Sequence, residues 1–250
     1  MSSKTIKVRN YFNVLFLLMV CMAILLFAEP SKSIFRQTTG DNYKSDSKKL
    51  TVIIDPGHGG FDPGKVGVTG VLEKDINLII AHKLKVFLEE NDINVIMTRD
   101  TDEGLYSEGD SNKKATDMRK RVEMINSSDA VLAVSIHQNS FTQESIKGAQ
   151  VFYYTNSQEG KTFAKIMQEQ LKKTIKDGNK REAKSNDSYY MLKKTECPLV
   201  IVECGYLSNY NESKLLVDDT YQEKLAWAIH LGIMTYINEY AHTAPVLAGK

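Results

Sequence analysis

Three short apolar runs, each rich in β-branched residues, set the strongest constraint on the fold of this chain. They span residues 50–55 (LTVIID), 130–136 (AVLAVSI) and 198–203 (PLVIVE), and no charge interrupts them before the final position. Short apolar runs without alternation are typical of strands that are buried on both faces, as in a parallel sheet. We therefore expect these three runs to lie in the interior of one sheet.

Amphipathic segments separate the expected strands. The spacing of apolar residues predicts helices over 75–90, 117–126, 161–174 and 221–240, and further strands over 94–98 and 148–154. Residues 100–116 and 177–188 are polar and lack a core pattern, so we expect loops there. This alternation favours an α/β fold with one domain, a three-layer α/β/α sandwich around a largely parallel twisted sheet.

The N-terminus combines basic residues with an apolar run. Lys4, Lys7 and Arg9 precede a nearly unbroken apolar stretch over 12–28, which is the arrangement of a signal peptide or an N-terminal membrane anchor. Residues 29–48 are polar and aperiodic, which indicates a flexible linker. We expect an exported, extracytoplasmic protein, membrane-associated or secreted, with its domain over 49–241 and a tail over 242–250.

Charge and cysteine content exclude some classes of protein. The formal net charge is +1, which gives no indication of a nucleic acid partner. Cys197 and Cys204 flank an expected strand, and at about 3.3 Å per residue they would lie roughly 23 Å apart, beyond the reach of a disulfide. Cys21 lies in the N-terminal apolar run, so the cysteines predict no disulfide framework.

Chemically reactive side chains follow the expected strands at one edge of the sheet. His58 and His137 come where two strands end, and Glu203 closes a third. In an open α/β sheet, ligands bind at this edge. Catalytic zinc sites use three His or carboxylate ligands and leave one position open, so His58, Glu73 and His137 are candidate ligands of one Zn²⁺ ion. Glu203 would then be a carboxylate beside the metal.

Each of these residues, taken alone, also has a structural explanation. A histidine in a glycine-rich turn can cap that turn, a glutamate before a helix is stabilised by the helix dipole, and a histidine at a strand end can be part of the core. The remaining histidines, His82, His230 and His242, lie on helix patterns or in the tail, and we expect no metal-binding role for them. The metal hypothesis therefore depends on the combination of His58, Glu73 and His137 at one edge of the sheet.

Five segments resemble, in order, those of a known enzyme family. They are DPGHGG (55–60), LEKDINL (72–78), TRDTD (98–102), RVEMINSSDAVLAVSIHQNS (121–140) and VECGYLSN (202–209). Together they are similar to the zinc-dependent N-acetylmuramoyl-L-alanine amidases of the amidase-3 type, over residues 49–240. The resemblance implies that His58, Glu73 and His137 bind zinc and that Glu203 is the catalytic carboxylate.

The resemblance also implies a substrate and a biological setting. The enzyme would cleave the amide bond between N-acetylmuramic acid and the L-alanine of the peptidoglycan stem peptide. Residues 105–126 and 148–154 are most similar to family members that trim spore cortex peptidoglycan. That similarity implies a role in cortex maturation and muramic-δ-lactam formation, in the space between forespore and mother cell. The resemblance is also compatible with an activating protein partner.

Other functions and residue roles stay open at this point. Asn139 and Arg99, near strand ends, are candidates for substrate binding, although Arg99 could instead pair with the acidic residues that follow it. Another zinc peptidase of the cell wall, a hydrolase that uses Cys204 as nucleophile and a non-enzymatic receptor are the alternatives. Alternation along an extended strand places Cys204 on the face opposite to Glu203, which argues against the thiol.

Overall fold

The computed structural model describes Met19 and residues 49–241. The expected signal or anchor segment, the linker and the tail fall outside these residues and stay predictions. In the part of the chain that is described, we find no helix with the length and apolar character that crossing a membrane requires.

Six strands form a single, mostly parallel sheet in the order β2-β1-β3-β6-β4-β5. Their bounds are β1 (Thr51–Pro56), β2 (Asn94–Met97), β3 (Leu132–Asn139), β4 (Gln150–Tyr154), β5 (Lys184–Asn186) and β6 (Leu199–Tyr206). Strand β4 pairs antiparallel with β6, and the other neighbouring strands pair in parallel. The three apolar runs become β1, β3 and β6, which are adjacent in the sheet, as expected.

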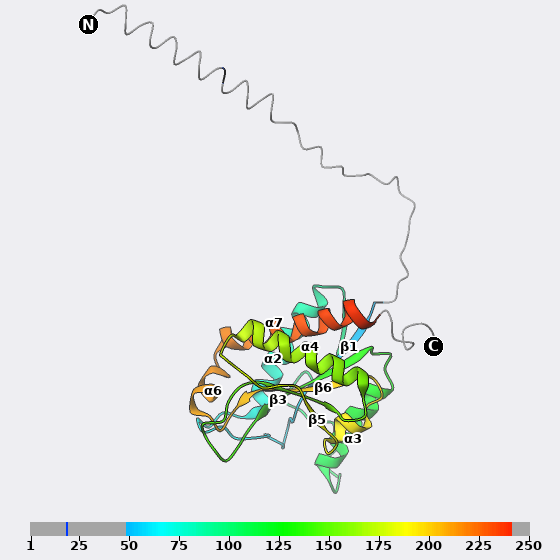
Figure 1. The fold of residues 1–250 in the computed structure, drawn as a ribbon. Helices are drawn as coiled ribbons and strands as arrows, with labels where there is room; N and C mark the ends of the chain where they lie inside the picture. Colours follow the sequence, from blue (N-terminus) through cyan, green and yellow to red (C-terminus); the bar gives the residue numbers. More distant parts are fainter. Residues whose placement is uncertain (1–18, 20–48, 242–250) are drawn as a thin grey trace, which may run out of the picture. The chain divides into compact units, whose positions relative to one another are not determined.

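Helices cover the two faces of this sheet, which confirms the three-layer α/β/α sandwich (Figure 1). One face carries α2 (Glu73–Glu89), α4 (Gln158–Ile175) and α7 (Asp219–Tyr236), and the other carries α3 (Lys113–Asn126) and α5 (Tyr190–Lys194). A short helix α6 (Tyr210–Leu215) follows β6, and a π-helical turn (Ile237–Ala241) follows α7.

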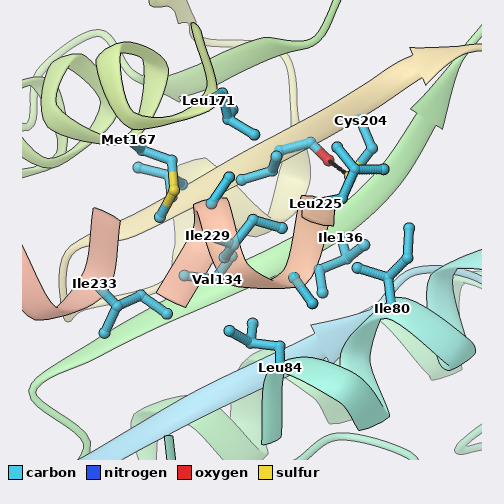
Figure 2. Packing of buried hydrophobic residues seen from close by; sticks show 14 of the residues in the cluster. Ile80, Leu84, Val134, Ile136, Met167, Leu171, Cys204, Leu225, Ile229 and Ile233 are labelled. Atoms are coloured by element: carbon cyan, nitrogen blue, oxygen red, sulfur yellow. Dashed lines mark hydrogen bonds between the residues drawn. The ribbon is translucent and has the colours of Figure 1, made fainter. Parts of the chain in front are cut away.

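Alternation along the central strands divides the core into two layers. Val202 and Cys204 of β6 pack against α2, α4 and α7, whereas Ile201 packs against α3 and α5. Figure 2 shows the first layer, in which side chains such as Leu84 of α2 and Ile229 of α7 meet β3 and β6. Burying an aliphatic side chain of this size stabilises the fold by roughly 1.5–3 kcal/mol. The carboxyl ends of β1, β3 and β6 are therefore firmly placed.

The structure extends or adds to the predicted elements in several places. Helix α3 begins at Lys113 rather than 117, because the Asn112 side chain accepts a hydrogen bond from the Ala115 amide and caps the helix. The expected loop 177–188 contains β5, which is three residues long and is defined by its pairing with β4. Helices α5 and α6 were not predicted, since elements of five or six residues show too little periodicity.

Candidate metal centre and active site

The loop after β1 is held by two buried arginines. His58 adopts a left-handed backbone conformation with a φ of 64°. Its carbonyl accepts a hydrogen bond from Arg121 at 2.6 Å, and the carbonyl of Gly57 accepts one from Arg99 at 3.1 Å. A non-glycine residue with positive φ is uncommon and persists where surrounding contacts impose it. The two guanidinium groups supply such contacts and fix the direction of the His58 side chain.

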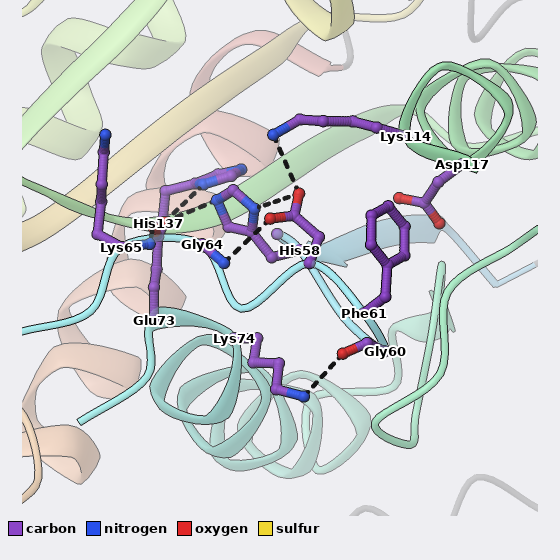
Figure 3. Close-up of polar contacts among 12 residues, drawn as sticks. His58, Gly60, Phe61, Gly64, Lys65, Glu73, Lys74, Lys114, Asp117 and His137 are labelled. Atoms are coloured by element: carbon purple, nitrogen blue, oxygen red, sulfur yellow. Dashed lines mark hydrogen bonds and ion pairs between the residues drawn. The ribbon is translucent and has the colours of Figure 1, made fainter. Parts of the chain in front are cut away.

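The structure brings His58, Glu73 and His137 together (Figure 3). One Glu73 oxygen, Oε1, lies 2.9 Å from Nδ1 of His137 and 3.2 Å from Nε2 of His58. The candidate ligand atoms of the three residues all lie within 4.8 Å of one another. These residues come from the β1–α2 loop, the first turn of α2 and the end of β3. The juxtaposition that the sequence predicts is therefore present.

Two glycines make room for this cluster. A Cβ atom on Gly57 would lie 2.2 Å from the His137 ring. A Cβ atom on Gly64, whose φ is 67°, would lie 2.6 Å from Oε2 of Glu73 and 2.7 Å from the His58 ring. Because real Cβ atoms essentially never approach other atoms so closely, only glycine fits at either position. The glycine-rich loop is required for the imidazoles to approach Glu73.

Asp62 orients His58 from the side away from Glu73. Its Oδ2 lies 3.0 Å from Nδ1 of His58 and 3.1 Å from Nζ of Lys114. Burial raises the pKa of Asp62, but hydrogen bonding and attraction to His58 outweigh this and lower it to about 2. An ionised carboxylate can only accept, so Nδ1 of His58 donates to Asp62, and Nε2 is the ring nitrogen that faces Glu73. Metal-ligating histidines commonly have this kind of support.

Glu73 is 2% exposed and ionised. Burial raises the pKa of Glu73, yet hydrogen bonds with His137 and His58 hold it well below its usual range. Its oxygens also accept from the backbone amides of Lys65 at 2.8 Å and Gln138 at 3.0 Å. The side chain is thus fixed in one orientation by both neighbouring segments.

The pKa of Glu203 is shifted upward, in the direction opposite to that of Glu73. It is 7% exposed, and its Oε2 is buried with no hydrogen-bond partner in the described structure. Burial raises the pKa of Glu203 to about 7, with His137 lowering it and Glu73 raising it further. Glu203 pairs with His137 across the β3–β6 ladder, so it stands beside the cluster. A carboxyl group with such a pKa can gain and lose a proton near neutral pH.

The residue types fit a zinc ion. Two imidazole nitrogens and one carboxylate oxygen converge, which is a common set of ligands in catalytic zinc sites. In a neutral His58 ring with its proton on Nδ1, Nε2 is a hydrogen-bond acceptor. It would then lie only 3.2 Å from a second acceptor, Oε1 of Glu73. A shared cation satisfies that arrangement, and the unpartnered oxygen of Glu203 is available to a water molecule.

The other predicted site residues divide into two groups. Asn139 lines the same cleft as His58, His137 and Glu203, a space of about 520 Å³. Arg99 does not line it and is 5% exposed, and its guanidinium donates to four backbone carbonyls. These contacts favour the structural alternative for Arg99, which holds the loop that carries His58, and they give no support to a substrate contact.

Cys204, the alternative nucleophile, and two histidines with no expected role, His82 and His230, do not line the cleft. Cys204 is completely buried in the core on the opposite face of β6, and burial raises the pKa of its thiol. His82 is exposed on α2, with Nε2 3.1 Å from the carbonyl of Asp100, and His230 is buried in α7. A nucleophilic role for Cys204 has no geometric support.

Some residues of the site were missed by the sequence analysis. Asp62 and Lys114 support His58, Arg121 holds its carbonyl, and Tyr189 lines the cleft near Glu203. The sequence could have indicated the role of Asp62, because a carboxylate four residues after a candidate histidine ligand can accept a hydrogen bond from its ring. The contacts of Arg121 and Lys114 depend on the packing of α3, which local patterns do not reveal.

Comparison with known proteins gives a consistent result. Residues 52–235 match the profile of the Amidase_3 family, described as N-acetylmuramoyl-L-alanine amidase. The chain is 38% identical over 211 residues to the germination-specific N-acetylmuramoyl-L-alanine amidase of Bacillus subtilis, covering 82% of this chain and 88% of the relative.

Solved structures of amidases share the fold. The CwlD amidase from Clostridioides difficile, solved in complex with the GerS lipoprotein, has 44% identity and a TM-score of 0.74, covering 76% of this chain and 99% of that one. AmiC2 of Nostoc punctiforme has 32% identity and a TM-score of 0.68, covering 77% and 99%. The chain belongs to the Amidase_3 family and is an N-acetylmuramoyl-L-alanine amidase, a hydrolase of peptidoglycan.

Proposed function

We propose that this amidase cleaves the bond between N-acetylmuramic acid and L-alanine with one zinc ion per chain, held by His58, Glu73 and His137. The observation that carries the proposal is the convergence of these three donors beside the buried, unpartnered carboxylate of Glu203. Zinc in such a site polarises a carbonyl group and lowers the pKa of a water molecule to about 7.

Glu203 acts as the general base and then as the general acid. It accepts a proton from the attacking water and passes it to the departing amine of L-alanine. Burial without a hydrogen-bond partner raises the pKa of Glu203, which favours uptake of the proton from water. Positioned proton transfer of this kind contributes about 10²- to 10⁴-fold to the rate.

The cleft supplies groups for the sugar and the peptide. Asn139, the last residue of β3, lines the cleft, and we propose that its side chain binds substrate. Tyr189, Tyr190, which is exposed, and Lys114 also line the cleft. Amide and aromatic groups around a buried base are suited to orienting a glycopeptide.

The relatives point to a spore-related role. The Bacillus subtilis relative is named germination-specific, and the Clostridioides difficile CwlD structure contains a lipoprotein partner. We infer that this chain acts on spore cortex peptidoglycan, where removal of the stem peptide prepares muramic-δ-lactam formation, and that a protein partner assists it. Spores that lack the gene should contain cortex without muramic-δ-lactam, and normal cortex in them would contradict the inference.

Action outside the cytoplasm requires export. The basic residues and apolar stretch at the N-terminus support a signal peptide or membrane anchor over 1–28. Fractionation of cells that produce the full chain tests this: we expect the protein in the membrane or extracytoplasmic fraction, and retention in the cytoplasm would refute the assignment.

The amidase activity is tested by digesting purified peptidoglycan with and without a chelator, followed by mass analysis of the released fragments. We expect free stem peptides that begin at L-alanine, and their release should stop when the metal is removed and resume when zinc is restored. Cut cross-links or cut glycan strands would overturn the proposed reaction. Undiminished release in chelator would overturn the metal dependence.

A further inference from the structure

A second pocket, of about 340 Å³, lies where the 177–181 loop meets the start of β4. Its lining includes the cations Lys147, Lys180 and Arg181 and the single carboxylate of Asp177. Among the described residues, none of these cations forms an ion pair, so positive charge prevails in the pocket. The active-site residues described above leave this feature unexplained.

The loop that carries Lys180 and Arg181 is attached by hydrogen bonds to the segment just before β4. The Asn179 side chain donates to the carbonyl of Ala149 at 2.7 Å and accepts from the amide of Arg181 at 2.9 Å. Gly148, with a φ of 96°, allows this approach, because a Cβ atom there would lie 2.7 Å from Oδ1 of Asn179. A polar pocket whose backbone is already fixed loses little entropy when it binds a ligand.

Arg181 connects the pocket to the catalytic carboxylate. Its Nη1 donates to Oε1 of Gln150 at 3.2 Å, and Gln150 is the direct antiparallel partner of Glu203. Side chains at such paired positions lie on the same face of the sheet, with Cβ atoms about 4.5–5.5 Å apart. The guanidinium also stacks 4.8 Å from the ring of Tyr206, three residues after Glu203. Arg181 is therefore held in place close to the reaction centre.

We propose that Lys147, Lys180 and Arg181 form a subsite that binds a free carboxylate of the stem peptide. This inference rests on the proposed amidase function. In a stem peptide, the residue after L-alanine is a D-glutamate joined onward through its side chain, so its α-carboxylate is free unless it is amidated. A guanidinium with fixed orientation binds a carboxylate with two parallel hydrogen bonds, and the lysines add charge.

The test uses two soluble muropeptides that differ only at this position, one with D-glutamate and one with its α-amide, D-isoglutamine. Steady-state kcat and KM are measured for the zinc-loaded enzyme and for Arg181→Gln, Lys147→Gln and Lys180→Gln. Lys173→Gln, an exposed lysine on α4 outside the pocket, is the matched control. The lysine variants keep the test decisive if Arg181→Gln does not fold, since the two lysine side chains make no hydrogen bond or ion pair with the described residues.

We expect wild type to prefer the free carboxylate. Arg181→Gln should raise KM for that substrate about 10- to 100-fold, with kcat nearly unchanged and no effect on the amide. Each lysine variant should show a smaller loss with the same selectivity, and Lys173→Gln none. Equal losses on both substrates, or no loss on either, would overturn the subsite while leaving the amidase intact. A wild-type enzyme that cleaves neither substrate would instead refute the proposed function.

Discussion

Replacing Gly57 with alanine should damage the metal centre without unfolding the domain. The new Cβ atom would lie 2.2 Å from Cε1 and 2.3 Å from Nε2 of the His137 ring, whereas ordinary contact begins at 3.4 Å. The ring must therefore move by roughly 1 Å, far more than the ±0.2 Å tolerance of metal–ligand distances. Because Gly57 does not have a positive φ, the alanine adds steric pressure rather than backbone strain.

The expected cost in folding is that of a local overpacking, about 1–3 kcal/mol in the free energy of unfolding. Zinc affinity, measured by competition with a chromogenic chelator, should fall at least 10-fold. Gly109→Ala is the matched control, since no atom lies within 4 Å of its Cβ position and its φ is not positive. A Gly57→Ala protein that binds zinc within about two-fold of wild type would refute the placement of His137 in the metal site.

Three further outcomes follow from contacts around the site. Asp62→Asn should lower zinc affinity about 10- to 100-fold, because the charged acceptor for Nδ1 of His58 is lost, and unchanged affinity would contradict its orienting role. Burial raises the pKa of Asp55, but Arg121, Ser135 and Thr98 lower it from 3.8 to about 2. Asp55 therefore contributes stability above about pH 4, on the order of 2 kcal/mol, that disappears as the pH falls toward 2. Urea unfolding should show this loss in wild type and a much weaker pH dependence in Arg121→Met. Cys204→Ala should keep its zinc and most of its turnover, since the thiol lies in the core, and an inactive but folded and metallated variant would restore the thiol hypothesis.

The sheet and the grouping of the candidate metal ligands were predictable, because local sequence patterns reveal both. Each of β1, β3 and β6 reads as an uninterrupted apolar run, and parallel packing brings their carboxyl ends to one edge. His58, His137 and Glu203 mark those ends, so their proximity follows from the fold class. Glu73 joins them because it opens the first helix after β1.

The supporting contacts were not predictable, because they join segments far apart in the chain. Arg121 reaches the carbonyl of His58 across 63 positions, and it does so only when α3 packs beside β1. The partners of Arg99 could not be predicted for a related reason: a charged residue at a strand end usually faces solvent, but here its guanidinium donates to the carbonyls of the loop. The sequence does not reveal which carbonyl groups of an irregular loop are buried and need a side-chain donor.

The most direct measurement places metal content beside turnover for Glu203→Gln. The amide keeps the size and shape of the side chain but cannot accept a proton from water. We predict that this variant binds one zinc ion per chain with wild-type affinity, while turnover on peptidoglycan falls by about 10²-fold or more. Loss of zinc from the variant would make Glu203 a ligand and reopen the role of Glu73, and unchanged turnover would remove Glu203 from the reaction.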